Sequence, residues 1–346
     1  MRLLVITQVV DADDPILAAT VPKLKALSGR CDQLVVLAGR VGAHDLPANC
    51  IVRCFGATDK VRRGLGFFRE IAPYVLGRRV DAVLAHMSPI YLVLAAPLAK
   101  PVRLPLLLWY THPTASRTLR LASALASART TATATSFPLP GPAEAIGHGI
   151  DVEAFACRGR DGERAVLDVL ALGRYSAVKG YETVLRAVHR AAEAGVGARL
   201  TIHGPALNDG ERRQLAKLER LRSELGLQDL VQLREALSPA EARERLGRAD
   251  VLVSNTVRGS ADKAVLEACA SCVPALASTW PELLPDVLRF EQDDTAALAA
   301  RLGELAEMGS DRRAELGRRL RTSVVEGHST ASWADAIVRV AREAGA

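Results

Sequence analysis

Residues 165–180 read AVLDVLALGRYSAVKG, and this stretch predicts both a fold class and a binding site. Its first eight residues are almost continuously apolar, as in a strand buried on both faces of a parallel sheet. A loop that contains Arg174 and Lys179 follows, and residues 181–192 then have the spacing of an amphipathic helix. The two cations therefore lie between the carboxyl end of a strand and the amino end of a helix. Open α/β sheets bind anions at this place, so the loop predicts a diphosphate site.

A second stretch, residues 259–268, reads GSADKAVLEA and follows another apolar strand at 249–254. It places Glu267 inside the next helix, where a carboxylate can accept hydrogen bonds from the hydroxyls of a ribose. A diphosphate site and a ribose site together predict a pocket for a nucleotide sugar.

The rest of the chain alternates strands and helices, which predicts parallel sheets covered by helices on both faces. Residues 147–164 interrupt the pattern with a Gly-rich, charged, non-periodic segment that is typical of a linker. We therefore expect an α/β protein of two doubly wound, Rossmann-like domains with a ligand cleft between them. Strands are expected at 2–7, 33–37, 51–54, 82–85, 104–109, 130–134, 143–146, 166–172, 199–203, 231–233, 251–254 and 275–277. Helices are expected at 15–27, 59–76, 89–98, 116–126, 181–192, 209–225, 239–246, 261–269, 294–308, 312–325 and 332–343.

Composition narrows the class of protein. The chain has 346 residues and a net charge of +6, which is compatible with anionic substrates. It has no basic block interleaved with aromatic residues, so we do not expect a nucleic acid partner. No apolar stretch reaches the ~20 residues of a membrane span, and no targeting segment stands out, so a cytoplasmic protein is expected.

The six cysteines do not suggest a disulfide framework in a chain of this length. Cys269 and Cys272 have C-x-x-C spacing, but no second Cys or His pair nearby completes a zinc site. We expect them to be small residues that pack at a helix end.

With these features, the chain resembles the retaining GT-B glycosyltransferases of the large family that includes sucrose synthase-like and mannosyltransferase enzymes. The resemblance covers nearly the whole chain, from the linker motif at 147–151, GHGID with Phe155, to Ser332-Trp333 at the start of the final helix. It implies a GT-B fold with an acceptor domain at 1–150, a nucleotide-sugar donor domain at 151–328 and a helix at 329–346 that packs back on the first domain. Arg174 and Lys179 correspond to the diphosphate-binding cations of the family.

The paired-Glu motif of the family is incomplete in this chain. Glu267 corresponds to the second Glu, which holds the donor ribose, but Gly259 stands where the first Glu is expected. Ser260, Asp262 and Lys263 occupy the loop between them. A bacterial branch of the family carries the same Gly-Ser-x-Asp-Lys pattern, with Asp-Asp-Pro after the first strand and Trp-Tyr-x-His in mid-domain. The corresponding residues here are 13–15 and 109–112.

Two interpretations of this loop remain open. Asp262 could replace the missing carboxylate as an acceptor for a sugar hydroxyl, and Lys263 could contact a phosphate. Alternatively, both are solvated residues at a helix amino terminus, where an acidic side chain is favoured.

Glycosyl transfer explains why these residue types are needed. A nucleoside diphosphate leaves as an oxocarbenium-like centre develops, and Arg174, Lys179 and helix N–H groups would stabilise its charge. No metal and no cofactor are then expected. An Asp-x-Asp at residues 11–13 is typical of metal-dependent glycosyltransferases of another fold, which the double α/β pattern contradicts.

The remaining candidate residues flank the expected cleft. His112 follows an apolar strand, and the resemblance implies contact with the donor sugar near the reacting centre; it could instead cap the next helix. His86 is a weaker candidate of the same kind. The expected donor site further includes Gly173, His203 and Gly204. Expected acceptor residues, or alternatively helix caps, are Asp11, Asp13 and Asp14.

Residues 60–79 combine six Lys or Arg residues with three aromatic residues. A basic amphipathic helix of this kind can lie on an anionic membrane surface, here the inner membrane face. The alternative is an ordinary packed helix with a solvated basic face.

The sequence thus predicts a metal-independent, retaining glycosyltransferase. It would move a sugar from a nucleotide-sugar donor to a hydroxyl of a glycan, a glycolipid or a natural product. Two alternatives stay open: a nucleotide-sugar 2-epimerase of the same fold, and an inactive nucleotide-sugar-binding homologue.

Overall fold

The computed structural model describes residues 1–14, 17–158, 166–257, 260–280 and 282–346. The chain divides into two compact units. The first comprises Met1–Asp151 and Gly327–Ala346, and the second comprises Val152–Glu326. These bounds lie close to the domain limits expected after residues 150 and 328.

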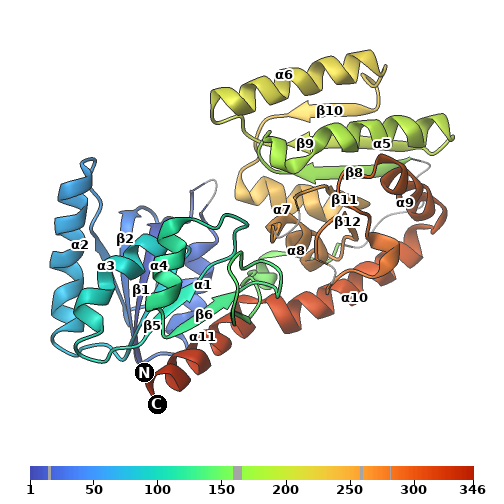
Figure 1. The fold of residues 1–346 in the computed structure, drawn as a ribbon. Helices are drawn as coiled ribbons and strands as arrows, with labels where there is room; N and C mark the ends of the chain where they lie inside the picture. Colours follow the sequence, from blue (N-terminus) through green and yellow to red (C-terminus); the bar gives the residue numbers. More distant parts are fainter. Residues whose placement is uncertain (15–16, 159–165, 258–259, 281) are drawn as a thin grey trace. The chain divides into compact units, whose positions relative to one another are not determined.

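The first unit contains a parallel sheet, of which Figure 1 labels β1, β2, β5 and β6. The strand order is β3-β2-β1-β4-β5-β6-β7. Its strands are β1 (Arg2–Val10), β2 (Gln33–Val41), β3 (Cys50–Cys54), β4 (Ala82–His86), β5 (Leu106–Trp109), β6 (Ala128–Thr131) and β7 (Glu144–Ala145). Its helices are α1 (Thr20–Ser28), α2 (Lys60–Val75), α3 (Pro89–Ala99), α4 (Arg117–Leu125) and α11 (Thr330–Gly345).

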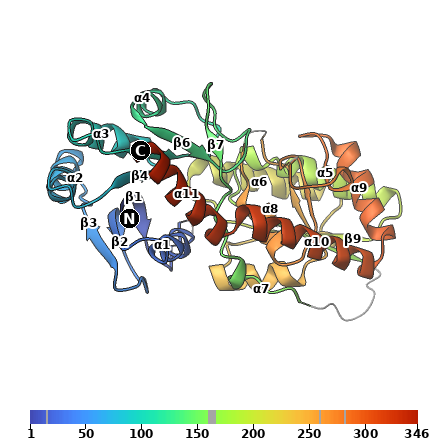
Figure 2. The same ribbon diagram turned by 90° about the horizontal axis from the view of Figure 1, so that it is seen from below.

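The core of the first unit forms on both faces of this sheet. Helices α2, α3 and α4 cover one face, where Phe67, Leu92 and Leu119 pack with strand residues such as Leu4 and Leu106. Helices α1 and α11 pack against each other on the other face (Figure 2). Both faces of the central strands, such as β4 and β5, are therefore buried, as their continuous apolar runs require.

The second unit contains a smaller parallel sheet in the order β10-β9-β8-β11-β12. Its strands are β8 (Leu167–Leu172), β9 (Ala198–His203), β10 (Val231–Arg234), β11 (Val251–Ser254) and β12 (Ala275–Ala277). Its helices are α5 (Tyr181–Glu193), α6 (Asp209–Glu224), α7 (Pro239–Arg248), α8 (Lys263–Ala270), α9 (Thr295–Glu307) and α10 (Ser310–His328). The predicted α/β class with two parallel sheets is confirmed.

Several predicted boundaries were wrong. Strands β1 and β2 extend to Val10 and Val41 rather than to residues 7 and 37. Two further differences have local causes. Helix α1 begins at Thr20 and not at residue 15, because a turn comes first. In this turn the backbone nitrogen of Leu17 donates to the carboxylate of Asp14 at 2.6 Å. Residues 15–16 themselves lie outside the described residues. Strand β6 ends at Thr131 and not at residue 134, because the N–H of Thr133 turns to the hydroxyl of Ser136 at 2.9 Å.

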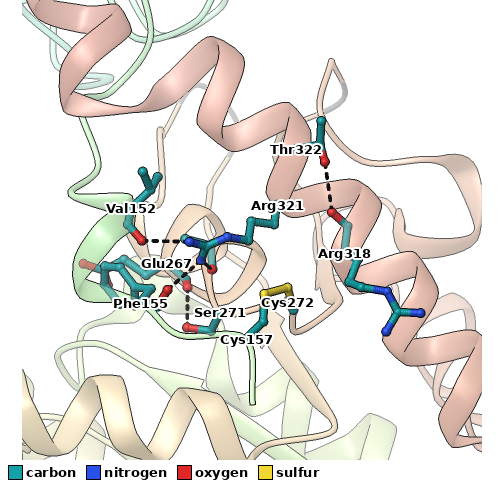
Figure 3. Close-up of a disulfide and its surroundings, with 10 residues drawn as sticks. Val152, Phe155, Cys157, Glu267, Ser271, Cys272, Arg318, Arg321 and Thr322 are labelled. Atoms are coloured by element: carbon teal, nitrogen blue, oxygen red, sulfur yellow. Dashed lines mark hydrogen bonds between the residues drawn. A yellow bond between two sulfur atoms is a disulfide. The ribbon is translucent and has the colours of Figure 1, made fainter. Parts of the chain in front are cut away.

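The cysteine prediction was also wrong, because Cys157 and Cys272 form a disulfide in the second unit (Figure 3). Cys272 directly follows the last turn of α8 and has a φ of 59°, a left-handed conformation that usually selects glycine after a helix. The pairing escapes a reading of local patterns because 115 residues separate the two cysteines. Cys269 is free and buried, as expected.

Arg321 of α10 also links the segment before Cys157 to the end of α8. Its guanidinium donates to the carbonyl of Phe155 at 2.6 Å, to that of Val152 at 3.2 Å, and to that of Ala270 at the end of α8. The segment before Cys157 is thereby held to the carboxyl end of α8 by hydrogen bonds as well as by the disulfide.

Candidate functional site

The loop after β8 has the backbone that the sequence predicts for an anion site. Strand β8 ends at Leu172, a short 3₁₀ turn covers Ala177–Lys179, and α5 begins at Tyr181. Gly173 and Gly180 have φ values of +142° and +55°, which are accessible mainly to glycine. A side chain at Gly173 would also lie 2.5 Å from the Cε atom of Lys179, so glycine leaves room for that lysine.

Lys179 is held by a buried carboxylate. Its Nζ atom lies 2.9 Å from Oδ2 of Asp262, which is the N-cap residue of α8. The hydroxyls of Ser254 and Thr256, at the end of β11, donate to the same oxygen at 2.6 and 2.9 Å. Burial would raise the pKa of Asp262, but the charge of Lys179 and these hydrogen bonds outweigh it, so the pKa is lowered.

Arg174 is held in the same way by a residue that the sequence interpretation missed. Its Nη1 atom lies 3.0 Å from Oε1 of Glu211, whose side chain is only 6% exposed. The other carboxylate oxygen accepts the N–H of Leu207 at 2.8 Å. Asn208 caps α6 by accepting the N–H of Glu211 at 3.0 Å. An Asn followed three residues later by Glu resembles a capping box, and this was the available signal for a structured acid here.

Helix α8 carries two further predicted donor residues, Lys263 and Glu267. Glu267 is largely buried and pairs with Lys263 one turn earlier at 2.8 Å. The charge of Glu267 raises the pKa of Lys263. Ser260 begins the described part of the preceding loop, with its N–H bonded to the carbonyl of Val257 at 3.1 Å. Gly259, where the first Glu of the motif is absent, lies outside the described residues. The structure therefore favours a paired Lys263 over a freely solvated one.

Gly204 brings the loop after β9 against the loop after β8. A side chain at Gly204 would lie 1.9 Å from the carbonyl oxygen of Gly173, so only glycine allows this approach. The Nδ1 atom of His203 lies 3.1 Å from the carbonyl oxygen of Glu235, and burial lowers the pKa of His203. The donor residues predicted on these two loops thus lie together at the carboxyl edge of the second sheet.

His112 is an exposed residue of the first unit, in the loop between β5 and α4. Its Nδ1 atom accepts the N–H of Thr114 at 3.2 Å, which leaves Nε2 as the nitrogen that carries the proton in the neutral ring. Ser116, and not His112, provides the N-cap hydroxyl of α4. The alternative that His112 caps this helix is therefore wrong.

Two of the three predicted acceptor carboxylates are already engaged within the first unit. Asp11 and Asp14 both form ion pairs with Arg40 of β2, which the sequence interpretation did not single out. Asp11 also accepts the N–H of Asp13 at 3.1 Å. Asp14 accepts the N–H of Leu17, but α1 begins at Thr20 after Ala19 and has no side-chain cap, so the alternative that Asp14 caps this helix is wrong. Asp13 is exposed.

An aromatic cluster fills the carboxyl edge of the first sheet. His86 of β4 stacks on Trp109 of β5 with ring centres 4.8 Å apart, and Trp333 of α11 packs edge-on against both. Lys23 of α1 is buried, and its Nζ atom lies 4.3 Å from the centre of the Trp109 ring. The ring of His148 packs edge-on against Trp109. No local pattern in the sequence predicts this cluster, because its members come from five separate segments.

A cavity of about 480 Å³ lies at the opposite edge of the sheet of the second unit. It is lined by residues at the amino ends of the strands, including Asp168, Arg199 and Gln232. Ligands of open α/β sheets bind at the carboxyl edge, so we do not assign the donor to this cavity. Within the described ranges, no group of three or more His, Cys, Asp and Glu side chains is arranged to hold a metal ion.

Comparison with known proteins decides the family of the second unit. Residues 166–308 match the family model described as glycosyl transferases group 1. These residues are a glycosyl transferases group 1 domain. A curated relative, the putative colanic acid biosynthesis glycosyltransferase WcaL of Escherichia coli (strain K12), is 26% identical over 189 residues. That alignment covers 51% of this chain and 45% of the relative, so the match spans less than half of the length of WcaL.

Solved structures extend the likeness in fold to both units. A glycosyltransferase from Rickettsia africae ESF-5 has a TM-score of 0.75 at 14% identity, over 99% of this chain and 98% of that one. A sucrose-phosphate synthase from Thermosynechococcus elongatus has a TM-score of 0.74 at 15% identity, over 99% of each chain. The predicted GT-B fold is confirmed.

The glycosyl transferases group 1 domain contains all of the predicted donor residues, from Gly173 to Glu267, and also Glu211. His112 and the three acidic residues of the β1 loop lie outside the matched range. Among the described residues, no helix is both long and apolar enough to cross a membrane.

Proposed function

We propose that this chain is a glycosyltransferase that moves a sugar from a nucleotide-sugar donor to a hydroxyl of an acceptor. The observation that carries the proposal is the position of Arg174 and Lys179 at the carboxyl edge of the second sheet, each fixed by a buried carboxylate. A third carboxylate, Glu267, is available for the ribose of the donor. The match of residues 166–308 to glycosyl transferases group 1 supports the same reaction class.

The finer features of the reaction belong to the proposal as well. We propose retention of anomeric configuration and stabilisation of the leaving diphosphate by the two cations without a metal ion. The acceptor would be a glycan, a glycolipid or a natural product, in the cytoplasm. His112, with its Nε2 proton exposed, would contact the donor sugar. Analysis of the product anomer by NMR tests retention, and activity after treatment with EDTA tests the metal-free reaction.

Binding of nucleoside diphosphates tests the central claim. Arg174→Ala and Lys179→Ala should each weaken the affinity for at least one of UDP, GDP and ADP by more than tenfold, because each change removes a charge-assisted contact of ~1.5–3 kcal/mol. Isothermal titration measures this. Arg199→Ala is the matched control, because Arg199 is an exposed cation at the opposite edge of the same sheet. Unchanged affinity in both test variants would contradict the proposal.

A donor-hydrolysis and transfer assay separates transfer from the two alternatives. A 2-epimerase would convert the sugar without an acceptor. An inactive homologue would bind the nucleotide without turnover. Because Gly259 replaces the first Glu of the motif, the assay has to include a test for nucleotide binding without turnover.

We further propose that α2 contacts an anionic membrane surface. Val61 and Leu65 are 70% and 66% exposed on this helix, beside the exposed cations Lys60 and Arg62. The opposite side of α2, which includes Phe67, is buried in the core. An apolar stripe flanked by cations fits the interface of an anionic bilayer.

Sedimentation with vesicles of phosphatidylglycerol or phosphatidylcholine tests this contact. The protein should sediment with the anionic vesicles and lose this binding in Val61→Ser/Leu65→Ser. Leu121→Ser is a suitable control, because Leu121 is a half-exposed apolar residue on α4. Equal binding of the test and control variants would mean that α2 is only a packed helix with a solvated face.

A further inference from the structure

Each of the two donor cations touches one buried acidic side chain that comes from a distant segment. Lys179 meets Asp262, 83 residues later, and Arg174 meets Glu211, 37 residues later. We propose that Asp262 and Glu211 are positioning residues, which act on the donor diphosphate mainly through Lys179 and Arg174, respectively. This inference rests on the proposed function, because it requires that the two cations bind the diphosphate.

The surroundings of Asp262 leave little capacity for a sugar hydroxyl. Its Oδ2 atom already accepts hydrogen bonds from Lys179, Ser254 and Thr256, and its Oδ1 atom is directed to the N–H of Ala264, 3.4 Å away at the start of α8. The side chain is 7% exposed. The carboxylate is therefore turned into the protein, and we assign it to the lysine rather than to the place of the absent first Glu.

Lys179 keeps donors for an anion in this arrangement. An ammonium group has three N–H donors, and Asp262 takes one of them. The stem of the side chain is confined on its other side by Gly173, where even a Cβ atom would not fit. The ammonium is thus fixed before the donor arrives, so binding does not have to restrict a flexible side chain and lose its conformational entropy.

Glu211 holds Arg174 and also holds the backbone of the adjacent loop. One of its oxygens holds the guanidinium and the other holds the N–H of Leu207, so a single carboxylate fixes both the cation and the loop after β9. The side chain of Arg174 remains 52% exposed. A guanidinium has five N–H donors, and Glu211 engages it only through Nη1, so the others remain for a phosphate.

Double-mutant cycles on nucleoside diphosphate affinity test the inference. UDP, GDP and ADP are titrated into Asp262→Asn, Glu211→Gln and the two alanine variants of the cations. They are also titrated into the four double variants that combine one carboxamide with one alanine. Each carboxamide variant should weaken binding about fivefold to tenfold. Asp262→Asn should have no further effect when Lys179 is already alanine, but its full effect when Arg174 is alanine. Glu211→Gln should show the reverse pattern, so each cross-pair is the matched control for the other.

A steady-state measurement distinguishes positioning from a loss of folding. Asp262→Asn should lower kcat for the nucleotide sugar more than it raises the donor KM, because charge on the diphosphate grows in the transition state. Rates are normalised to the binding-competent fraction from titration. Ser254→Ala, which removes one hydroxyl from the carboxylate and no charge, should lower kcat less than threefold.

The possible outcomes separate this inference from the function on which it rests. If neither cation variant weakens nucleoside diphosphate binding, the proposed function fails, and the inference fails with it. If the cation variants weaken binding but Asp262→Asn keeps its effect beside Lys179→Ala, Asp262 contacts the donor directly and only the inference is overturned. Tighter binding by Asp262→Asn would also overturn it, since the carboxylate would then act mainly by repelling the diphosphate.

Discussion

The carboxyl edges of the two sheets have the same backbone origin but different chemistry. In the first unit this edge is filled by stacked rings and one buried lysine, with His86 on Trp109 and Lys23 above them. In the second unit the corresponding edge carries cations that are each tied to one buried carboxylate. A buried aromatic cluster contributes mainly to stability, whereas fixed cations are available to bind an anion. The parallel topology therefore provides an edge at which a ligand can bind in each sheet. The side chains at that edge determine whether it can bind an anion.

The largest effect is expected in the aromatic cluster of the first unit. Trp109→Ala should lower the free energy of unfolding of this unit by about 3–5 kcal/mol, because it empties the centre of the cluster. Nucleoside diphosphate affinity should not change. Chemical denaturation and titration measure the two quantities, and Trp109→Phe serves as a milder control. Weaker nucleotide binding at unchanged stability would break the contrast between the two edges.

The disulfide adds a stabilising contribution that belongs to the second unit alone. Cys157→Ser/Cys272→Ser should lower its free energy of unfolding by about 2–4 kcal/mol, because the bridge closes a loop of 115 residues in the unfolded chain. A reducing agent should have the same effect on the unchanged protein. The variant Cys157→Ser/Cys272→Gly should recover about 1 kcal/mol, because glycine adopts the left-handed conformation at this position freely. No difference between the oxidised and the reduced protein would contradict the prediction.

Between pH 6.5 and 4, acid should weaken the first unit more than the second, in which one histidine, His203, has a lowered pKa. Burial lowers the pKa of His328 to about 4 and that of His86 well below its ordinary value. An unfolded chain then binds more protons than the folded one below pH 6.5, so stability is complete above that pH and is lost towards pH 4. The loss from His328 is at most about 3 kcal/mol at 1.36 kcal/mol per pKa unit.

Asp262 in the second unit behaves differently, because its pKa is lowered from 3.8. Its contribution is present above pH 3.8 and is lost only at lower pH. Denaturation of each unit as a function of pH, followed by hydrogen exchange, measures both windows. His328→Gln should reduce the loss in the first unit between pH 6.5 and 4. If both units weaken equally between pH 6.5 and 4, the buried histidines of the first unit are not the cause.

Local patterns in the sequence predict the elements of the fold and the backbone of the donor site. The apolar run of β8, the glycines around Arg174 and the periodicity of α5 all lie within 30 residues, so each is visible in one stretch. The carboxylate partner of each cation is not visible, because strand order and loop contacts bring it from a distant segment. Glu211 and the disulfide were missed for this reason, and the role expected of Asp262 was left open.

The smallest effect is expected at Glu267, which tests whether the ribose lies at the second edge. Its side chain is 19% exposed and already carries one ion pair, with Lys263 at 2.8 Å. Glu267→Gln keeps the shape and removes the charge, so it should raise the donor KM roughly fivefold through weaker hydrogen bonds to the ribose hydroxyls. The penalty should shrink with a 2′-deoxyribose donor, which lacks one of these contacts. Lys263→Met is the matched control, because it removes the ion pair and keeps the carboxylate. Equal penalties for ribose and deoxyribose donors in Glu267→Gln would place the ribose elsewhere, and the same penalty in Lys263→Met would assign the effect to the ion pair.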